Sequence, residues 1–475
     1  MRKVEGSSPP VSTTRLPDFI REFYTYGGPI TESVTDERGI PVQLIKRLLR
    51  CVPVLLFANM IWLFHSIGFR SVFVLLAAAV LEVLPYPHDR WATRRLRILH
   101  SGCEMLYVFA FSFLVECGIW IHIFAVKSLI FWLNLLCSLL VLFAVLLSGM
   151  LCIFFCSKQA GILRRVLLLI FWWLPGVNFY LIVQIGAAAR REYRFELACL
   201  ERDEIRKSSE LCNTRYPILL VHGIFFRDWQ LLDYWGRITS ELTKNGARVY
   251  FGKQQSADAV ARSAEELCQQ ILRVIELENC EKVNIIAHSK GGLDSRYAIT
   301  HYGMDQYVAS LTTVNTPHWG CNFVDLLLRV LPEGVIGFLA GRYNALFRKL
   351  GDIDPDFEKG VRDLTAARCA EFNRETPDSP GVYYQSVMSR LRSARSAIFP
   401  MNLCYLLIRR LDGDNDGLVA VDSAVWGDYR GLIETPYRKG VSHGDVVDLL
   451  RENLKGFDVR EYYVQLVHDL KKRGF

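Results

Sequence analysis

The sequence predicts an α/β fold, a mostly parallel doubly wound sheet, preceded by an α-helical transmembrane domain. Apolar residues fill 51% of the 475 positions and the mean hydropathy is positive, which a soluble domain with a charged surface rarely reaches. Long apolar stretches lie only within residues 51–186, whereas short apolar runs alternate with amphipathic segments from Tyr216 onward. A chain of this length also favours two structural units.

Charge and cysteine usage exclude two classes of function. The formal charge of +7 is modest for this length, and lysines and arginines lie beside apolar stretches, so nucleic acid is not an expected partner. The thirteen cysteines include no CxxC pair, so neither a disulfide framework nor a zinc site is expected. Residues 1–45 are predicted to form a polar tail without a cleavable signal peptide.

Long apolar stretches predict a multi-span region over residues 46–187. A helix of about 20 apolar residues crosses the hydrocarbon core of a bilayer. The second stretch is short and Pro175-Gly176 interrupts the fifth, so the number of spans stays open between four and five, with tilted, re-entrant or interfacial segments as alternatives. The stretches are 51–69, 71–84, 103–126, 129–155 and 166–185.

Basic residues flank these stretches in alternation. By the positive-inside rule, the basic residues within 46–50, 90–97 and 158–165 are cytoplasmic, so a complete fifth span would place the C-terminal domain outside. Arginines within 190–194 follow that span, however, and an exported domain with seven cysteines would be unusual. The side of the membrane on which the C-terminal domain lies therefore stays open.

A charged helical stalk is predicted over 188–215 and the α/β domain over 216–475. In a parallel sheet, functional residues gather at the carboxyl ends of the strands. The predicted strands are 216–221, 247–251, 282–287 and 308–314, with helices over 231–244 and 257–278.

Residues 283–292 combine a buried strand, a sharp turn at Ser289 and a helix-compatible run. A nucleophile elbow forces strained backbone angles on its serine and brings strand and helix together, so small residues are needed two positions before and two after it. Ala287 and Gly291 meet this requirement, although glycine is commoner at the first position. We predict Ser289 to be the nucleophile of a serine hydrolase.

The segment His222-Gly223-Ile224-Phe225 directly follows the first predicted strand. Gly223 permits a tight bend that turns the N–H of Ile224 toward a developing oxyanion, and the N–H of Lys290 is the second expected donor. Because both donors are backbone groups, the side chains of Ile224 and Lys290 are expected to matter less than their geometry. His222 is predicted to support the loop.

A serine of this kind needs a base and an orienting carboxylate, which follow it in the order Asp or Glu, then His. His443 is one of two histidines beyond the polar turn at 411–417, and the other, His468, lies in a terminal amphipathic helix. We therefore predict His443 to be the general base.

The acid stays open among three aspartates of the polar turn, namely Asp412, Asp414 and Asp416. Their spacing also resembles the start of an EF-hand calcium loop. That interpretation is disfavoured because Ser423 stands where a bidentate glutamate is needed.

With these motifs, residues 216–450 resemble the secreted bacterial triacylglycerol lipases of the α/β-hydrolase fold. Segments 216–223 and 282–289 are similar to their oxyanion and elbow strands, and 316–320 to the loop that ends their next strand. The run 415–419 matches their acid motif, which selects Asp416, and His443-Gly444-Asp445 matches their histidine motif. The resemblance implies acylglycerol substrates and, with the apolar stretches, a multi-pass location in a bacterial plasma membrane.

These lipases often bind a structural calcium ion through an aspartate two residues after the histidine, which Asp445 would supply, and through a second aspartate well before the acid. Residues 391–408 contain no acidic residue, so a complete calcium site is not expected. We predict that no cofactor is required.

Residues 321–351 contain two apolar runs bracketed by glycines. They indicate either a packed helical insertion or a lid that opens its apolar face at a lipid surface.

We predict a membrane-anchored serine lipase or carboxylesterase that cleaves acyl esters through an acyl-Ser289 intermediate, with lipid and the bilayer as partners. The oligomeric state stays open. A phospholipase or acyltransferase using the same triad is one alternative. A membrane scaffold with a vestigial hydrolase domain is another, which is disfavoured because every triad and oxyanion position is filled.

Overall fold

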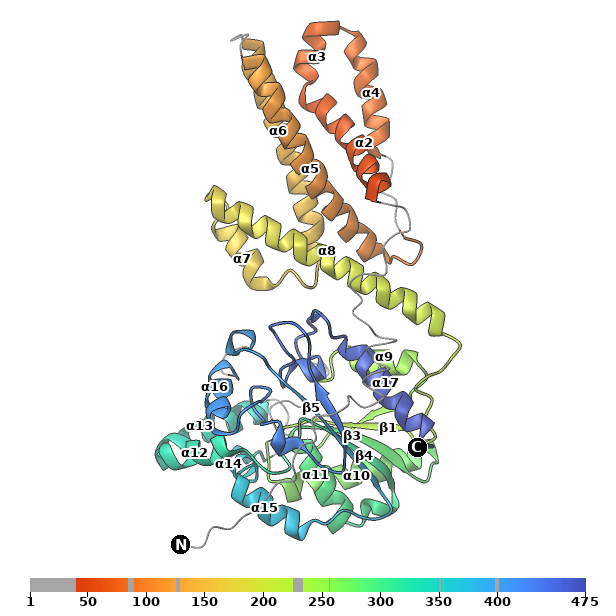
Figure 1. Ribbon diagram of the computed structural model, residues 1–475, viewed down its shortest axis with the longest axis vertical. Coiled ribbons are helices and arrows are strands. Elements are labelled where there is room, and N and C mark those ends of the chain that lie inside the picture. Colours follow the sequence, from red (N-terminus) through yellow and green to blue (C-terminus); the bar gives the residue numbers. More distant parts are fainter. Residues whose placement is uncertain are drawn as a thin grey trace. The chain divides into compact units, whose positions relative to one another are not determined.

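The computed structural model describes residues 40–83, 89–124, 129–224, 234–255, 257–349, 352, 354–397 and 401–475. Most of the predicted polar tail lies outside these residues. The chain divides into two compact units (Figure 1). We call Ile30–Ile205 the helical unit and Arg206–Phe475 the α/β unit.

The helical unit contains seven described helices. Of these, α5 and α6 pack side by side along their lengths, and α2 and α3 meet at Asn59 with a bend of 70°. The helices are α2 (Ile40–Ala58), α3 (Met60–Ile67), α4 (Arg70–Val83), α5 (Arg94–Phe124), α6 (Leu129–Cys156), α7 (Ile162–Ile170) and α8 (Pro175–Arg206).

Within the described residues, two helices, α5 and α6, are long and apolar enough to cross a membrane, or three spans exist if the bent pair α2–α3 counts as one. This is fewer than the four or five spans predicted. The first predicted stretch breaks at Asn59, the second is the 14-residue helix α4, and the fifth is interrupted just before Pro175. Hydropathy finds apolar stretches, but it does not locate the breaks between helices.

The predicted boundary between the fifth stretch and the charged stalk falls inside one helix, α8. Glu192, in the charged half of α8, is buried. It accepts hydrogen bonds from Arg95 Nη1 (2.6 Å) and Ser157 Oγ (2.7 Å). These bonds fasten α8 to α5 and to the loop after α6.

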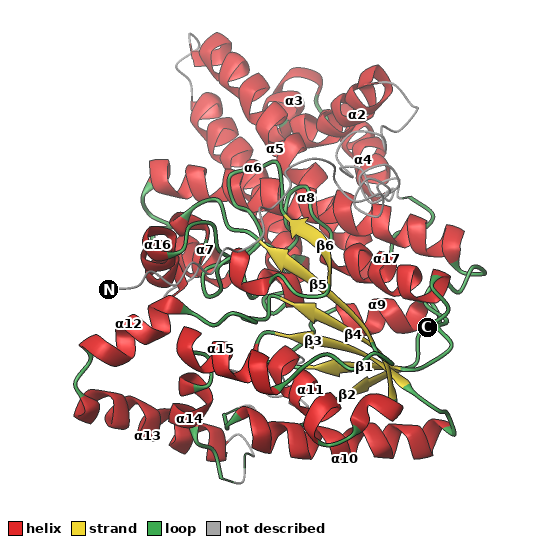
Figure 2. Cartoon of the chain, turned by 60° about the horizontal axis from the view of Figure 1, so that its bottom comes forward, coloured by secondary structure: helices red, strands yellow, loops and turns green. Residues whose placement is uncertain are grey.

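The α/β unit is built on six parallel strands in the order β2-β1-β3-β4-β5-β6 (Figure 2). The order reverses between β1 and β3, where an open parallel sheet has its crevice. The predicted α/β fold class is therefore confirmed. The strands are β1 (Ile218–Val221), β2 (Val249–Phe251), β3 (Val283–His288), β4 (Val308–Val314), β5 (Tyr383–Ser389) and β6 (Asp428–Ile433).

Alternate side chains of the central strands serve two helical layers. Ile218 and Leu220 pack with α9 (Ile238–Lys244) and α17 (Val459–Lys472), whereas Leu219 and Val221 pack with α10 (Val260–Glu278) and α11 (Lys290–His301). The sheet therefore has helices on both faces, and its four predicted strands are all present. The helix predicted from residue 231 begins at Ile238, and residues 225–233 lie outside the described residues.

One helical insertion lies between β4 and β5, and a second lies between β5 and β6. The first carries α12 (Asn322–Val330), α13 (Glu333–Lys349), α14 (Phe357–Arg362) and α15 (Ala366–Glu375), and the second carries α16 (Met401–Leu411). The predicted lid corresponds to α12 and α13, and its residues 350 and 351 lie outside the described residues. Apolar side chains on these helices remain exposed, among them Val330, Phe338, Leu346 and Leu406.

Candidate active site

Ser289 lies in the turn between β3 and α11 with φ 55° and ψ −132°. A positive φ is strained for a residue other than glycine, and such strain is typical of functional sites. A Cβ added to Gly291 would clash with the backbone oxygen of His222, so α11 approaches β1 too closely for a larger residue. Ala287 at the end of β3 is fully buried. The turn has the geometry of a nucleophile elbow.

His443 lies in the loop after β6, with its Nδ1 2.6 Å from Asp416 Oδ2. Asp416 is fully buried. Its Oδ1 accepts hydrogen bonds from the N–H groups of Leu418 and Val419, both at 2.8 Å, and its Oδ2 accepts one from Asn315 Nδ2 at 2.5 Å. These donors fix the carboxylate, which favours the tautomer of His443 with the proton on Nδ1 and leaves Nε2 without one.

The other two candidate aspartates have different partners. Asp412 Oδ1 accepts a hydrogen bond from Asn322 Nδ2 at 2.6 Å. Asp414 pairs with Arg390 at 2.6 Å and also with Arg409. Of the three aspartates of the turn, Asp416 is therefore the one in contact with His443.

His443 and Ser289 come from loops that follow different strands, β6 and β3, at the same edge of the sheet. The ring of His288, the residue before Ser289, lies 4.4 Å from the ring of His443 between centroids. Within the described residues, Ser289 Oγ and His443 make no hydrogen bond to each other. Catalytic hydrogen bonds are often long before a substrate binds.

Ile224 directly follows Gly223, whose backbone lies close to Ser289, and Lys290 directly follows Ser289 in the chain. Ile224 is buried in an apolar cluster with Val260, Leu293 and Leu364, and Lys290 is the first residue of α11. In the described part of the chain, neither backbone N–H has an acceptor. Two such donors are what an oxyanion hole requires. Phe225, the last residue of the predicted loop, lies outside the described residues.

Gly223 and His222 form the turn beneath these donors. A Cβ added to Gly223 would lie 2.8 Å from the Cβ of Ser289, so the loop contacts the nucleophile closely. The fully buried His222 has its Nδ1 2.9 Å from the carbonyl oxygen of Gly223. The His222 side chain thus contacts the backbone of its own loop, and its supporting role stays a prediction.

Tyr234 and His288 were missed by the sequence reasoning. Tyr234 Oη accepts a hydrogen bond from the N–H of Gly223 (3.1 Å) and lies 2.6 Å from His288 Nδ1. Burial lowers the pKa of His288 well below its usual value, so this ring stays neutral. No motif surrounds Tyr234, and the only signal for His288 is its position before the nucleophile.

The side chain of Lys290 is also engaged, contrary to the expectation that it matters little. Its Nζ donates to Ser263 Oγ (2.9 Å) and pairs with Asp294 Oδ1 (2.7 Å), and both partners of the ion pair are buried. Burial raises the pKa of Asp294, and the ammonium of Lys290 opposes that shift. The residue whose N–H is the second expected oxyanion donor is therefore also held by its side chain, one turn along α11 at Asp294.

Replacing Lys290 by methionine is expected to reduce the free energy of unfolding by about 3 to 5 kcal/mol, because it leaves Asp294 buried without its partner. K290M/D294N should recover most of this loss. The matched control is Lys359→Met, which breaks the solvent-accessible pair of Lys359 with Asp356 at 2.9 Å and should cost less than about 1 kcal/mol. Denaturant unfolding of the full chain in detergent measures these values, and equal losses in K290M and K359M would contradict the expectation.

His318 is a second buried histidine near the sheet edge. Its Nε2 lies 2.9 Å from Thr313 Oγ1 and its Nδ1 3.3 Å from Arg296 Nη1. Burial, and then the cation of Arg296, lower the pKa of His318 well below its usual value.

Stability is therefore expected to fall in acid. The unfolded chain binds protons at His288 and His318 below a pH of about 6.5, whereas the folded chain does not. Each of these two histidines therefore lowers the free energy of unfolding by roughly 1.4 kcal/mol per pH unit below that value. We expect the Tm of the full chain to fall between pH 7 and pH 5 and His318→Asn to reduce that slope. A slope unchanged in the variant would show that the folded chain protonates His318.

The surroundings of Asp445 do not fit a calcium ion. Its Oδ2 accepts a hydrogen bond from the N–H of Ser442 at 3.1 Å, and Lys439 Nζ lies 3.7 Å from its Oδ1. Among the described residues, no group of three or more His, Cys, Asp or Glu side chains is arranged to hold a metal ion. The ammonium group of Lys439 is thus the positively charged neighbour of the Asp445 carboxylate.

The chain is similar to known proteins. Residues 218–328 match the family described as "Putative serine esterase (DUF676)". The triacylglycerol lipase of Pseudarthrobacter phenanthrenivorans is 37% identical over 178 residues, covering 35% of this chain and 55% of the relative, so the chain spans about half the length of that relative. The triacylglycerol lipase of Vibrio cholerae serotype O1 is 36% identical over 287 residues, covering 55% of this chain and 89% of the relative.

A solved structure, the mature lipase BlEst2 of Bacillus licheniformis, is 20% identical and covers 53% of this chain and 91% of its own, with a TM-score of 0.40. Sheet topology and elbow geometry define the class, which is that of serine hydrolases with the α/β-hydrolase fold. The similarity to the Vibrio lipase extends over most of that protein, and the chain belongs to the triacylglycerol lipase family. The resemblance predicted from the motifs is thus confirmed.

Proposed function

We propose that the protein is a membrane-anchored serine lipase or carboxylesterase that hydrolyses acyl esters, acylglycerols foremost. One observation carries the proposal. The buried Asp416–His443 pair lies at the edge of the sheet where the strained elbow holds Ser289. The family supports acyl esters as the substrate class, since the Vibrio relative is named a triacylglycerol lipase.

In the proposed reaction, Ser289 Oγ attacks the ester carbonyl carbon while His443 Nε2 accepts the hydroxyl proton. The negative charge on the carbonyl oxygen is stabilised by the N–H groups of Ile224 and Lys290. The C–O bond of the leaving alcohol then breaks, and the alcohol takes the proton from His443. Water, activated by the same histidine, hydrolyses the acyl-Ser289 ester and restores the enzyme.

The helical unit supports membrane anchoring. Helices α5 and α6 have 31 and 28 residues, and only 22% of the most apolar window of each is buried. Polar side chains such as Asn134 and Glu116 are buried, whereas Leu140 and Phe143 are exposed. Apolar residues outside and polar residues inside are the arrangement that lipid favours.

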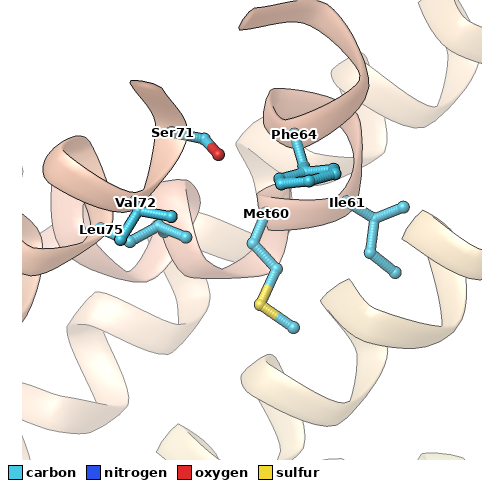
Figure 3. A pocket seen from close by; sticks show the side chains of 6 residues that line it. All are labelled: Met60, Ile61, Phe64, Ser71, Val72 and Leu75. Atoms are coloured by element: carbon cyan, nitrogen blue, oxygen red, sulfur yellow. The ribbon is translucent and has the colours of Figure 1, made fainter. Parts of the chain in front are cut away.

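A groove between α3 and α4 is also lined mainly by apolar side chains (Figure 3). Its single polar side chain, Ser71, donates a hydrogen bond to the carbonyl oxygen of Gly68 at 2.7 Å. The groove therefore offers a ligand only apolar contact. It is lined by Met60, Ile61, Phe64, Ser71, Val72 and Leu75.

The exposed apolar side chains of α12 and α13 support the lid. Val330, Phe338 and Leu346 lie in water-accessible positions where a soluble surface would carry polar groups. We infer that these two helices meet lipid when substrate enters the site. A bilayer anchor would keep that surface close to the phase in which acyl chains reside.

A substrate series tests the proposal. Full-length protein in detergent or vesicles is given triacylglycerols of rising chain length, phospholipids and short-chain esters, with the Ser289→Ala variant as the blank. We expect faster release of fatty acid from glycerides than from phospholipids. Faster phospholipid cleavage would favour the phospholipase alternative, and transfer to an added alcohol the acyltransferase. No Ser289-dependent turnover of any ester would favour the scaffold.

Membrane anchoring is tested separately, by alkaline carbonate extraction of cell membranes. We expect the full chain to stay in the pellet. Its release into the supernatant would overturn the anchoring part of the proposal without affecting the hydrolase part.

A further inference from the structure

Three arginines of the helical unit meet around Tyr107, where α2, α5 and α8 come together. The guanidinium carbon of Arg47, on α2, lies 4.4 Å from the centroid of the Tyr107 ring, and that of Arg190, on α8, lies 4.7 Å from it. Arg194, one turn further along α8, lies close enough to interact electrostatically with Tyr107 and with both other arginines. We call Arg47, Arg190 and Arg194 the arginine cluster.

Among the described residues, the arginine cluster makes an ion pair with a carboxylate through Arg47 alone. Glu104 makes two hydrogen bonds of 2.7 Å with Arg47 and so neutralises one of the three cations. Neither Arg190 nor Arg194 makes an ion pair with any residue in the part of the chain that the structure describes. Two unneutralised positive charges therefore remain side by side.

A buried carboxylate of the same unit has a cation beside it, since Arg95 contacts Glu192 at 2.6 Å. In the arginine cluster, Arg190 is half-buried and Arg194 is exposed, and like charges held close together repel each other. An anion that bridges Arg190 and Arg194 would relieve the repulsion, and the planar guanidinium groups suit the paired oxygens of a phosphate.

The position of the cluster along the helices indicates the source of the phosphate. In α2, Arg47 and Arg50 precede the apolar run that ends at Ala58. In α5, charged residues lie between Arg94 and Glu104 and the longer apolar part follows them. Charged residues give way to apolar ones at the level where lipid headgroups meet the hydrocarbon core, and basic pockets between membrane helices bind such headgroups.

We infer that the arginine cluster is a binding site for the phosphate of an anionic phospholipid headgroup. The inference rests on the membrane anchoring proposed above and is independent of the hydrolase activity. Arg190 and Arg194 supply the two unneutralised cations, Arg47 is paired with Glu104, and the Tyr107 ring contacts both Arg47 and Arg190. One bound lipid would tie α2, α5 and α8 together at the membrane surface.

Lipid competition tests this site. Full-length protein is placed in phosphatidylcholine nanodiscs, and its relative affinity for phosphatidylglycerol is measured by native mass spectrometry or by quenching with brominated lipid. The test variant is R190Q/R194Q. The matched control is Arg191→Gln, which removes an exposed cation from the neighbouring position on the same helix.

We expect the wild type to prefer phosphatidylglycerol and R190Q/R194Q to lose about tenfold or more of that preference, whereas R191Q keeps most of it. R190K/R194K should retain part of it, because the charge remains. No preference in the wild type, or equal losses in R190Q/R194Q and R191Q, would overturn the inference. Displacement by millimolar inorganic phosphate would show that the site takes free phosphate, which would overturn the headgroup as its ligand.

The same samples separate this inference from the proposed function. A soluble short-chain ester reports Ser289-dependent hydrolysis, and carbonate extraction reports anchoring. Intact hydrolysis and anchoring with no lipid preference would contradict only the inference that the arginine cluster binds a lipid headgroup. Release from the membrane would instead remove the anchoring on which the inference rests.

Discussion

Replacing Ser289 by alanine is expected to lower kcat/KM for ester hydrolysis by about 10⁴-fold or more. The hydroxyl is the only nucleophile that the elbow presents, and the oxyanion donors and the histidine have no role in covalent catalysis without it. Initial rates on a soluble short-chain ester, with purified full-length protein, measure the effect.

The matched control for this prediction is Ser240→Ala, which removes a hydroxyl from an exposed position on α9. It should keep wild-type activity. Since alanine adds no atom at the elbow, S289A is also expected to keep the wild-type Tm. A fall of less than tenfold in S289A would mean that another residue supplies the nucleophile.

Replacing Asp416 by asparagine is expected to lower kcat by about 10⁴-fold, because an amide cannot hold His443 in the tautomer that leaves Nε2 as the base. The 2.6 Å contact between Asp416 Oδ2 and His443 Nδ1 is the reason for the size of the effect. The rate should fall at all pH values at which the wild type is active.

Asp412→Asn and Asp414→Asn are the controls for this prediction. They lie in the same turn, but they contact Asn322 and two arginines instead of the histidine. We expect both variants to keep activity within about tenfold of wild type. Comparable losses in D412N and D416N would show that the carboxylate next to His443 is not the orienting acid.

The part of the site that could be predicted from sequence is the part built from short, local patterns. The elbow at Ser289 and the loop at Gly223 each need small residues at fixed offsets from a strand, and a strand end fixes where they lie. The histidine followed from elimination. The acid did not, because Asp412, Asp414 and Asp416 look alike in sequence, and the family resemblance was needed to choose among them.

Interactions between distant segments could not be predicted. Tyr234 reaches His288 across 54 positions, and Lys290 reaches Ser263 across 27, so neither contact leaves a local pattern. Strand β6, with the sequence DYRGLI and half-exposed side chains, lacks the apolar run that marked the earlier strands. The number of membrane spans could not be predicted either, because it depends on a bend at Asn59 that hydropathy does not reveal.

Active-site labelling tests the central claim most directly. The full chain in detergent is treated with a fluorophosphonate, which modifies only a serine activated by its own base and oxyanion hole, and the modified residue is located by peptide mass mapping. We predict one label per chain, on the peptide that contains Ser289, and none after heat denaturation or in S289A. No label on the native protein, or a label on another serine that persists in S289A, would contradict the account.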